Sequence, residues 1–425
     1  MRYVIIGAGP AGVEAAFEIR RRDPDSDVTV VGAEPYPPYS RVLLSYLIAG
    51  MPMDRVYVWG RNVFRRLGAE HIMGVGVQGI DHSRNVVLLS DGGSVCFDRL
   101  LISSGASARA SSVPGAELDG VTVLRSLADA KVILSCLGSA KAVLVVGGGF
   151  VSLKAAEALW ATGKCVTVVV SSSQILSQGM SARAACVVQR SLEQKGIRFL
   201  LETDVSGFCG RRRVRSAVLS NGAEVECDLA VIGKGVTPSC GFLQNAGVEV
   251  RAGVVVDDRM ATTREGVYAA GDVAETCDLA RREPRVNALW PNAVEQARVA
   301  AANMAGDDAK YAGSISMNAT RFAGLHVMSC GVTRPKDQDE AVGAFFGSGC
   351  YRELVFRQGR LIGSTQVGEV INAGALYWAV RNEAVGIERA GLVMSLPLSY
   401  GDAVSACGAA RSIKGRTRAR QGEQR

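Results

Sequence analysis

The sequence predicts an α/β protein with two Rossmann-like dinucleotide-binding domains and a C-terminal α+β interface domain. Two observations locate the Rossmann units: a glycine-rich turn follows an apolar segment at residue 7, and a second such turn follows about 140 residues later. The third observation is size and composition. A chain of 425 residues is too long to fold around a single hydrophobic core. With 48% hydrophobic and 21% charged residues, it is also too apolar to be disordered. We therefore expect two or three globular domains.

The net charge of +7 lies mostly at the C-terminal end. Residues 411–425 carry six basic side chains and one acidic side chain, so the rest of the chain is nearly neutral. Such a basic tail is usually a solvated end, with a site for an anionic partner as the alternative. We expect no nucleic-acid binding. The chain lacks a basic start followed by a long apolar segment, and it has no apolar run of about 18 residues. We therefore expect a cytoplasmic protein without a membrane span.

The cysteines and histidines exclude several kinds of site. The eleven cysteines include no CxxC pair, and the closest two, Cys227 and Cys240, are thirteen positions apart. That spacing lacks the signals of zinc sites, iron–sulfur clusters and redox dithiols. With only three histidines, a hydrolytic triad or a multi-histidine metal site is also disfavoured. We expect no metal site in this chain.

The first glycine-rich turn has the features of a dinucleotide-binding loop. An apolar strand leads into Gly7, Gly9 and Gly12, a helix follows, and Glu34 stands just beyond a second apolar strand. In such a loop the first glycine permits the tight turn, the second lets the backbone approach a pyrophosphate, and the third lets helix and strand pack closely. Glu34 lies where a carboxylate binds a ribose diol, and the helix N-terminus attracts phosphate.

The second turn repeats this pattern with two changes. Gly147 and Gly149 keep the first two positions, but Ser152 replaces the third glycine, and the strand that ends at Val170 is followed by serines instead of an acid. A serine is small enough for close packing, whereas the missing carboxylate weakens the case for a ribose contact. The loop therefore indicates a second nucleotide, with a degenerate loop kept as scaffold as the alternative.

With these two loops, the chain resembles the FAD-dependent pyridine nucleotide oxidoreductases over nearly its whole length. Residues 37–45 are similar to the family's segment beside the flavin ring, and residues 101–106 are similar to the turn that leaves the flavin domain. The most specific similarity is at residues 267–272, where the resemblance implies that Asp272 binds the ribityl chain of FAD. Residues 289–298 resemble the family's helix whose N-terminus faces the flavin pyrimidine edge. A positive helix end suits a reduced flavin, which carries negative charge there.

The motifs and the resemblance together imply a set of cofactor-binding residues. These are Gly7, Gly9, Pro10, Ala11, Gly12, Glu34, Arg41, Ser45, Ser104, Gly105, Gly147, Gly149, Phe150, Val151, Gly271, Asp272, Pro291 and Ala293.

The chain also departs from the family at positions close to the flavin. Disulfide reductases of this fold carry one or two cysteines there, but this chain has no cysteine before Cys96, which excludes thiol chemistry at that place. Many relatives have a lysine and a glutamate where this chain has Tyr46 and Lys154. We expect Lys154 and Tyr46 to line the contact between flavin and nicotinamide as candidate catalytic residues. The alternative is that Lys154 is a solvent-facing helix lysine.

The resemblance implies an enzyme with three parts. We expect a flavin domain from residues 1–112 and 257–308, an NAD(P)-binding domain from residues 113–256, and a C-terminal interface domain from residues 309–425. The last is similar to the third domain of nitrite-reductase-type flavin subunits, NADH:rubredoxin reductases and the flavin subunit of phenylglyoxylate dehydrogenase. The expected activity is transfer of electrons from NAD(P)H, through FAD, to a redox protein such as rubredoxin or ferredoxin, or to an iron–sulfur partner subunit. The alternative is a flavin-binding structural subunit with a degenerate nicotinamide site, and a homodimer is possible in either case.

Overall fold

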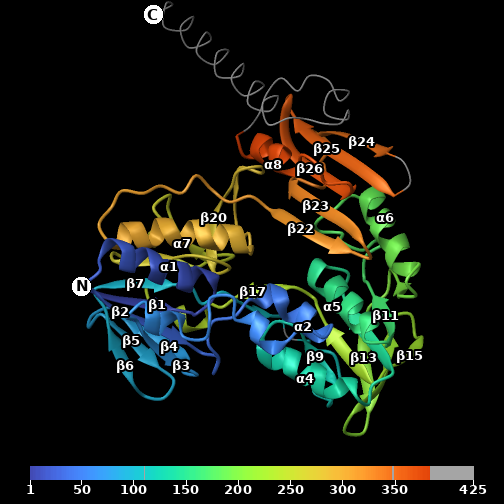
Figure 1. Ribbon diagram of the computed structural model, residues 1–425, viewed down its shortest axis with the longest axis horizontal. Coiled ribbons are helices and arrows are strands. Elements are labelled where there is room, and N and C mark those ends of the chain that lie inside the picture. Colours follow the sequence, from blue (N-terminus) through green and yellow to red (C-terminus); the bar gives the residue numbers. More distant parts are fainter. Residues whose placement is uncertain (110, 347–348, 383–425) are drawn as a thin grey trace, which may run out of the picture.

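The protein is described by a computed structural model that covers residues 1–382 apart from residues 110, 347 and 348 (Figure 1). Three parts are visible. A first unit, with the N-terminus, forms one side of the molecule, a second unit lies opposite it, and a C-terminal domain sits above the second unit (Figure 1). The basic tail at residues 411–425 falls outside the described residues.

The first unit is built on a five-stranded parallel sheet. Its strands are β1 (Arg2–Ile6), β2 (Asp27–Gly32), β3 (Glu70–Met73), β7 (Arg99–Ile102) and β19 (Val267–Ala269). They lie in the order β19-β7-β1-β2-β3. Helices α1 (Pro10–Arg22) and α7 (Trp290–Met304) pack against each other on one face (Figure 1). Four of the five residues of β1 are buried, as expected for a strand covered on both faces.

Shorter elements complete the first unit. An antiparallel sheet covers the second face of the parallel sheet, and a mostly helical segment connects β2 to β3. The antiparallel sheet contains β4 (Val77–Asp81), β5 (Val86–Leu89) and β6 (Ser94–Cys96). The connecting segment contains η1 (Arg41–Leu43), α2 (Leu44–Ile48), η2 (Met53–Val56) and α3 (Val63–Arg66). A further small sheet contains β18 (Val254–Val255), β20 (Ala274–Asp278) and β21 (Glu283–Arg285).

The second unit repeats the same design. Its parallel sheet contains β9 (Val121–Val123), β10 (Ala142–Val146), β11 (Cys165–Val169), β12 (Arg198–Leu200) and β16 (Leu229–Ile232), in the order β12-β11-β10-β16-β9. Its helices are α4 (Leu127–Leu137), α5 (Phe150–Ala161) and α6 (Ala182–Glu193). An antiparallel sheet of β13 (Val205–Gly210), β14 (Val214–Leu219) and β15 (Glu224–Glu226) covers the face opposite α5.

Alternation along β10 shows why this sheet is buried on both faces. Val143 and Val145 belong to the core shared with α5, whereas Leu144 and Val146 belong to the core shared with the antiparallel sheet. An apolar residue is therefore needed at every position of the strand, which explains the continuous apolar run in the sequence.

Two short strands mark where the chain crosses between the units. These are β8 (Ala106–Ala108) and β17 (Val236–Pro238), which pair antiparallel. Beyond them, η3 (Gly241–Leu243) leads into Ala246 and Val248, whose side chains pack in the core of the first unit. The exact domain boundaries stay a prediction, but this packing favours a return to the first unit before residue 257.

The C-terminal domain is an antiparallel sheet with one helix. Its elements are β22 (Met317–Phe322), β23 (Leu325–Gly331), β24 (Glu340–Phe346), β25 (Cys350–Arg357), β26 (Arg360–Gly368) and α8 (Ala373–Arg381). Leu376 and Val380 of α8 are buried against this sheet. On the sheet's other face, Phe322 and Tyr351 join the core of the second unit. The predicted fold class, two Rossmann-like units with a C-terminal α+β domain, is confirmed.

Candidate cofactor site

The first glycine loop lies between the end of β1 and the start of α1. Gly7 has a φ of 111°, and a methyl group on Gly12 would collide with the carbonyl oxygen of Gly7. A methyl group on Gly9 would instead meet no atom within 4 Å. Gly9 therefore borders open space in front of α1, whose first residues are Pro10 and Ala11. This arrangement suits a pyrophosphate, because backbone N–H groups at a helix N-terminus attract anions.

Glu34 is held in place by two neighbours from its own segment. The Tyr39 hydroxyl donates a hydrogen bond to Glu34 Oε2 at 2.6 Å, and the Arg41 guanidinium binds Glu34 Oε1. Burial raises the pKa of Tyr39, so the phenol stays protonated and able to donate. The Glu34 side chain is 30% exposed. A fixed and accessible carboxylate fits the ribose-binding role predicted for Glu34, with Arg41 as its support.

The turn at Gly271 and Asp272 meets the first loop and α7. A side-chain carbon added at Gly271 would lie 3.2 Å from the Ala11 Cβ and 3.6 Å from the Ala293 Cβ. The Gly271 amide donates to Gln296 Oε1 at 2.8 Å, which ties the turn to α7. Pro291, in the first turn of α7, needs no amide partner there. The structure thus brings three separate predicted segments, at Ala11, Gly271 and Ala293, to one edge of the first sheet.

Asp272 has a charged partner that sequence reasoning missed. Arg125, in the loop before α4, binds Asp272 Oδ2 through Nη2 at 2.8 Å and donates from Nε to the Ala106 carbonyl at 2.9 Å. Arg41 donates in turn to the Arg125 carbonyl at 2.8 Å. Arg125 therefore places a cation among the predicted FAD residues. Its only sequence signal is its position before the helix cap Ser126, because Asp272 lies 147 positions away.

Other predicted residues lie beside the crossing strands. The Ser104 hydroxyl donates to the Ser239 carbonyl at 2.9 Å, and the Ser239 amide donates to the Gly105 carbonyl at 2.9 Å. Gly105 has a φ of 71°. Ser45 is buried on α2. Ser104 and Gly105 thus connect the two segments that cross between the units. Both residues, which were predicted to bind cofactor, therefore have a structural role here.

The second glycine loop keeps the same shape despite Ser152. Gly147 has a φ of 116°, and a methyl group on Gly149 would meet no atom within 4 Å. The Ser152 hydroxyl is buried and donates to the Gly233 carbonyl at 3.0 Å. Ser152 therefore stabilises the close approach of α5 to β16 through a hydrogen bond in a place where relatives use a glycine. The shape of this loop therefore supports the predicted second dinucleotide site, as the shape of the first loop supports the predicted FAD site.

The start of α5 faces the first unit and the C-terminal domain. Phe150 stacks on Phe322 with ring centroids 6.2 Å apart, while Val151 is 57% exposed. Tyr46 on α2 is 45% exposed, and α2 packs against α5. Large apolar side chains that stay exposed where two helices meet are typical of a binding surface.

Lys154 and Tyr46, the candidate catalytic residues, are close together. The Lys154 ammonium lies 5.2 Å from the Tyr46 ring centre and donates to Glu157 Oε2 at 2.7 Å and to the Arg321 carbonyl at 3.0 Å. The Lys154 side chain is only 20% exposed, so it is not a freely solvated helix lysine. Glu157 Oε1 also accepts from the Ala323 amide at 2.7 Å. The same pair therefore holds the β22–β23 turn against α5.

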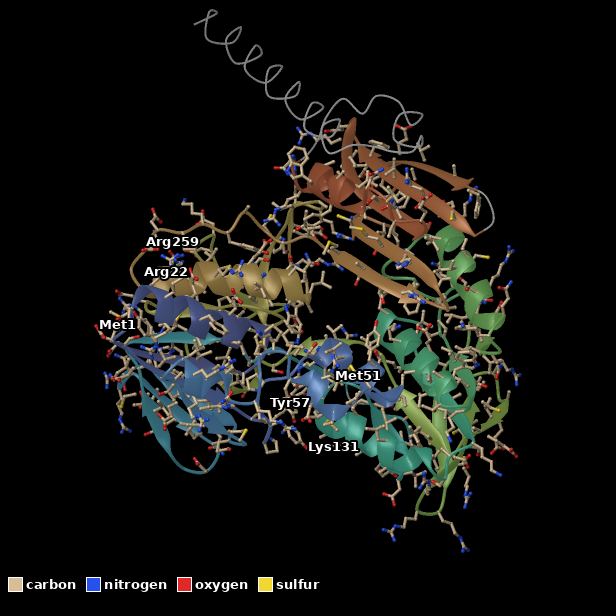
Figure 2. All side chains as sticks on the ribbon, viewed as in Figure 1. Met1, Arg22, Met51, Tyr57, Lys131 and Arg259 are labelled. Carbon is tan, nitrogen blue, oxygen red and sulfur yellow. The ribbon has the colours of Figure 1, made fainter. Side chains whose placement is uncertain are left out.

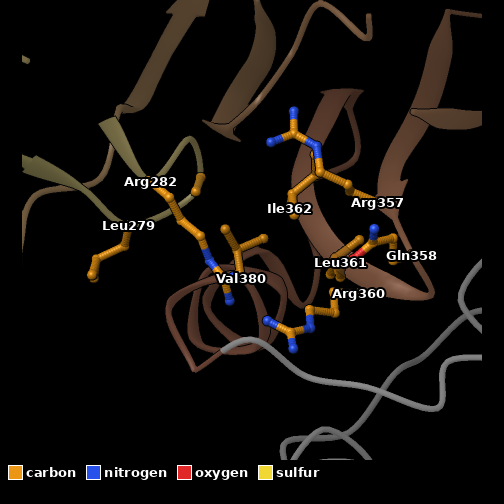
Figure 3. A pocket seen from close by; sticks show the side chains of 9 residues that line it. Leu279, Arg282, Arg357, Gln358, Arg360, Leu361, Ile362 and Val380 are labelled. Atoms are coloured by element: carbon orange, nitrogen blue, oxygen red, sulfur yellow. The ribbon is translucent and has the colours of Figure 1, made fainter. Parts of the chain in front are cut away.

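A small pocket lies away from both loops, between the β20–β21 hairpin and the β25–β26 turn (Figure 3). Its lining includes Arg282, Arg357 and Arg360 beside the apolar Leu361. Arg357 is paired with Asp339, with Nε 2.7 Å from Oδ1. None of the predicted site residues lines this pocket, so it is separate from the cofactor loops.

The described part of the chain has neither a membrane-spanning helix nor a cluster of metal-binding side chains. Outside residues 110, 347, 348 and 383–425, no helix is long and apolar enough to cross a membrane. Over the same residues, no three His, Cys, Asp or Glu side chains gather in a way that could hold a metal ion.

Comparison with known proteins places the chain in a family. Residues 1–297 match the pyridine nucleotide-disulphide oxidoreductase family model. The chain is 32% identical over 380 residues to the epsilon subunit of NADH-dependent phenylglyoxylate dehydrogenase from Aromatoleum evansii, with 88% of this chain and 90% of that protein covered. It is 31% identical over 398 residues to a rubredoxin-NAD(+) reductase from Ectopseudomonas oleovorans, with 90% and 99% covered. The solved structure of an NAD-dependent persulfide reductase from A. fulgidus has a TM-score of 0.87 at 26% identity, covering 98% of this chain and 84% of that one.

These findings confirm the predicted oxidoreductase class and the predicted pair of cofactors, FAD and NAD(P)H. The individual site residues stay predictions that the geometry supports. With two glycine loops of one design and these similarities, the chain belongs to the pyridine nucleotide-disulphide oxidoreductase family.

Proposed function

We propose that this protein is an FAD-dependent NAD(P)H oxidoreductase that passes electrons to an iron–sulfur protein or partner subunit without a redox-active cysteine. The observation that carries the proposal is the pair of glycine loops, each with a second glycine, Gly9 or Gly149, that borders open space at a helix start. The relatives named rubredoxin-NAD(+) reductase and phenylglyoxylate dehydrogenase subunit support a redox-protein or complex partner.

The chain supplies binding and orientation, and the bound cofactors supply hydride transfer and electron release. Gly9 and the N-terminus of α1 would bind the FAD pyrophosphate, Glu34 its ribose, and Asp272 with Arg125 the chain between pyrophosphate and ring. The N-terminus of α7 would stabilise negative charge on the reduced ring. Gly149 and the exposed Val151 would bind the nicotinamide nucleotide. Because α2 carries no cysteine, the chain would offer a bound flavin no thiol there, and its electrons would reach the acceptor without a thiol intermediate.

The alternative function is that of a structural subunit with a degenerate nicotinamide loop. Two sequence features suggest it, namely Ser152 and the missing acid after β11. The hydrogen bond from Ser152 to the Gly233 carbonyl preserves the loop shape, which favours a working site. Anaerobic stopped-flow spectroscopy with NADH and with NADPH tests this point. We expect rapid loss of the visible flavin absorbance with at least one nucleotide. A flavin that binds but is bleached by neither nucleotide would refute the proposed activity.

The proposal also covers the cellular location and the oligomeric state. A cytoplasmic location fits the ten free cysteines in the described part of the chain, because reducing compartments keep thiols unpaired. A homodimer stays a prediction, which sedimentation of the purified protein would test.

A further inference from the structure

Two tryptophans stack on each other at the start of α7. The ring centroids of Trp59 and Trp290 are 5.1 Å apart, and the ring planes differ by 12°. Trp290 is the first residue of α7, and Trp59 belongs to the loop between η2 and α3. Both side chains are only partly buried. The stack therefore lies one turn from Ala293, where α7 meets the Gly271 turn and the first glycine loop.

The loop that carries Trp59 is also strongly basic. Residues 53–66 contain four arginines and one aspartate, a net charge of +3, and all four arginine side chains are exposed. Arg61 lies over the Tyr57 ring at 4.2 Å, and Arg66 donates to the Trp59 carbonyl oxygen. Figure 2 shows Tyr57 near the middle of the molecule, where the first and second units meet. An aromatic pair beside the predicted cofactor site is thus flanked by basic side chains, of which Arg61 is also paired with Asp54, with Nη2 2.5 Å from Oδ1.

The packing of this segment explains why these groups stay at the surface. Val56, Leu44 and Leu47 form a small core with Leu127 of α4, and Tyr57 lies at the edge of that core. Val58, the next residue, is 51% exposed. The anchored residues hold the backbone of the loop in one place, beside the tryptophan stack.

We propose that this surface, Trp59 and Trp290 with Arg55, Arg61, Arg65 and Arg66, docks a small acidic iron–sulfur carrier and that electrons leave the flavin across the tryptophan pair. The proposal rests on the function proposed above and adds the acceptor and its place of contact. A basic surface attracts an acidic partner and speeds the encounter, and aromatic side chains are preferred at interface centres. In the complete reaction, one NAD(P)H is oxidised to NAD(P)⁺, two one-electron carriers are reduced, and one proton is released.

The first test removes charge. The holoenzyme is reduced by NADH or NADPH under argon and mixed with oxidised rubredoxin or with an oxidised [2Fe–2S] ferredoxin, at low and at high ionic strength. The variant Arg61→Gln/Arg65→Gln should reduce the carrier about tenfold more slowly at low salt, with the difference shrinking at high salt. Isothermal titration with the oxidised carrier should show weaker binding by the same variant. The matched control, Arg211→Gln/Arg215→Gln on the β13–β14 sheet, removes equal charge from exposed positions and should change neither quantity.

The second test removes the stack. Trp59→Leu should slow carrier reduction while leaving two rates unchanged, namely flavin reduction by the nicotinamide nucleotide and flavin oxidation by a small neutral quinone. Trp59→Phe keeps an aromatic ring and should retain most of the carrier rate. FAD content and thermal unfolding identify any variant that fails to fold.

The outcomes separate this proposal from the one it rests on. Equal carrier rates in wild type, Arg61→Gln/Arg65→Gln and Trp59→Leu would overturn the docking surface. A wild-type enzyme that is reduced by nicotinamide nucleotide but oxidised by neither carrier would also overturn it, while leaving the nicotinamide reaction intact. Absence of flavin reduction would instead refute the proposed function itself.

Discussion

Single residues in this protein act by fixing the charged groups that face the cofactor loops. Each carboxylate oxygen of Glu34 accepts one hydrogen bond from its own segment, Oε2 from Tyr39 and Oε1 from Arg41, and the side chain stays 30% exposed. Tyr39 also accepts a hydrogen bond from the Leu127 amide at 2.8 Å, which links the first unit to α4. Glu34 is therefore already oriented for the ribose that we propose it binds, which would lower the entropy cost of binding.

Replacing Tyr39 should weaken FAD binding. Tyr39→Phe removes the hydroxyl that donates to Glu34, and a hydrogen bond to a charged group contributes about 1.5 to 3 kcal/mol. We expect the FAD dissociation constant to rise at least about tenfold, as measured by fluorescence titration of the apoprotein. Tyr57→Phe, in the same segment but with its ring against Arg61, is the matched control. Equal FAD affinities for the two variants would contradict this role of Tyr39.

A second residue-scale prediction concerns pH and stability. The Arg2 guanidinium and amide hydrogen-bond Asp98 and lower the pKa of its carboxyl from 3.8 to about 2. The pair therefore contributes stability above about pH 4, which is lost as the pH falls toward 2. Both side chains are more than a third exposed, so solvent screening keeps this contribution small. Urea unfolding of Asp98→Asn should show a small loss at neutral pH that disappears near pH 2.

At the scale of elements, alanine substitutions at Gly12 and Gly9 should have different effects, because only Gly12 has no room for a methyl group. In Gly12→Ala the added methyl group would collide with the Gly7 carbonyl, so α1 must move away from β1 and the apoprotein should lose thermal stability. In Gly9→Ala the methyl group enters open space, and the φ of −80° at residue 9 is allowed for alanine. The apoprotein should then keep its Tm but bind FAD much more weakly. A normal FAD affinity for Gly9→Ala would show that the pyrophosphate lies elsewhere.

The elements that the sequence predicted are those with local signals. A strand, a glycine turn and a helix within about twenty residues define each Rossmann unit. The glycines are needed for the tight turn and for close packing of that strand and helix, so the signal is local. The structure confirmed this fold, and Gly7 and Gly147 do adopt positive φ. Contacts between distant segments had no such signal. Arg125 with Asp272, and Trp59 with Trp290, depend on how the units pack, which no periodicity in the sequence encodes.

At the scale of the whole molecule, Lys154 and Glu157 connect the second unit to the C-terminal domain. Glu157 accepts the Ala323 amide, and Lys154 donates to the Arg321 carbonyl. The sequence identified Lys154 as unusual but could not show that it binds the β22–β23 turn. Any role of Lys154 beside the flavin is therefore combined with a role in domain packing.

Removing Glu157 should loosen this contact. Glu157→Ala leaves the Ala323 amide without its acceptor and Lys154 with only the Arg321 carbonyl, and an unsatisfied buried donor costs about 1 to 3 kcal/mol. Hydrogen exchange of the β22 and β23 amides should become faster, while β1 and β2 amides stay unchanged. Glu193→Ala, an exposed glutamate on α6, is the control and should have no effect on exchange. Unchanged protection of β22 and β23 in Glu157→Ala would show that apolar packing alone holds the domain.

The interruption of the first unit by the second determines the order of assembly during synthesis. β19 and α7 follow β16 in the chain, so a nascent first unit leaves the ribosome with one edge of β7 unpaired and α1 uncovered. The second unit is one continuous stretch of chain from β9 to β16, so its parallel sheet can form before β19 and α7 are synthesised. If α7 binds the flavin as we propose, capture of FAD waits for α7. A ribosome-bound chain that stops before Trp290 should therefore retain an immobilised nicotinamide nucleotide and fail to retain flavin.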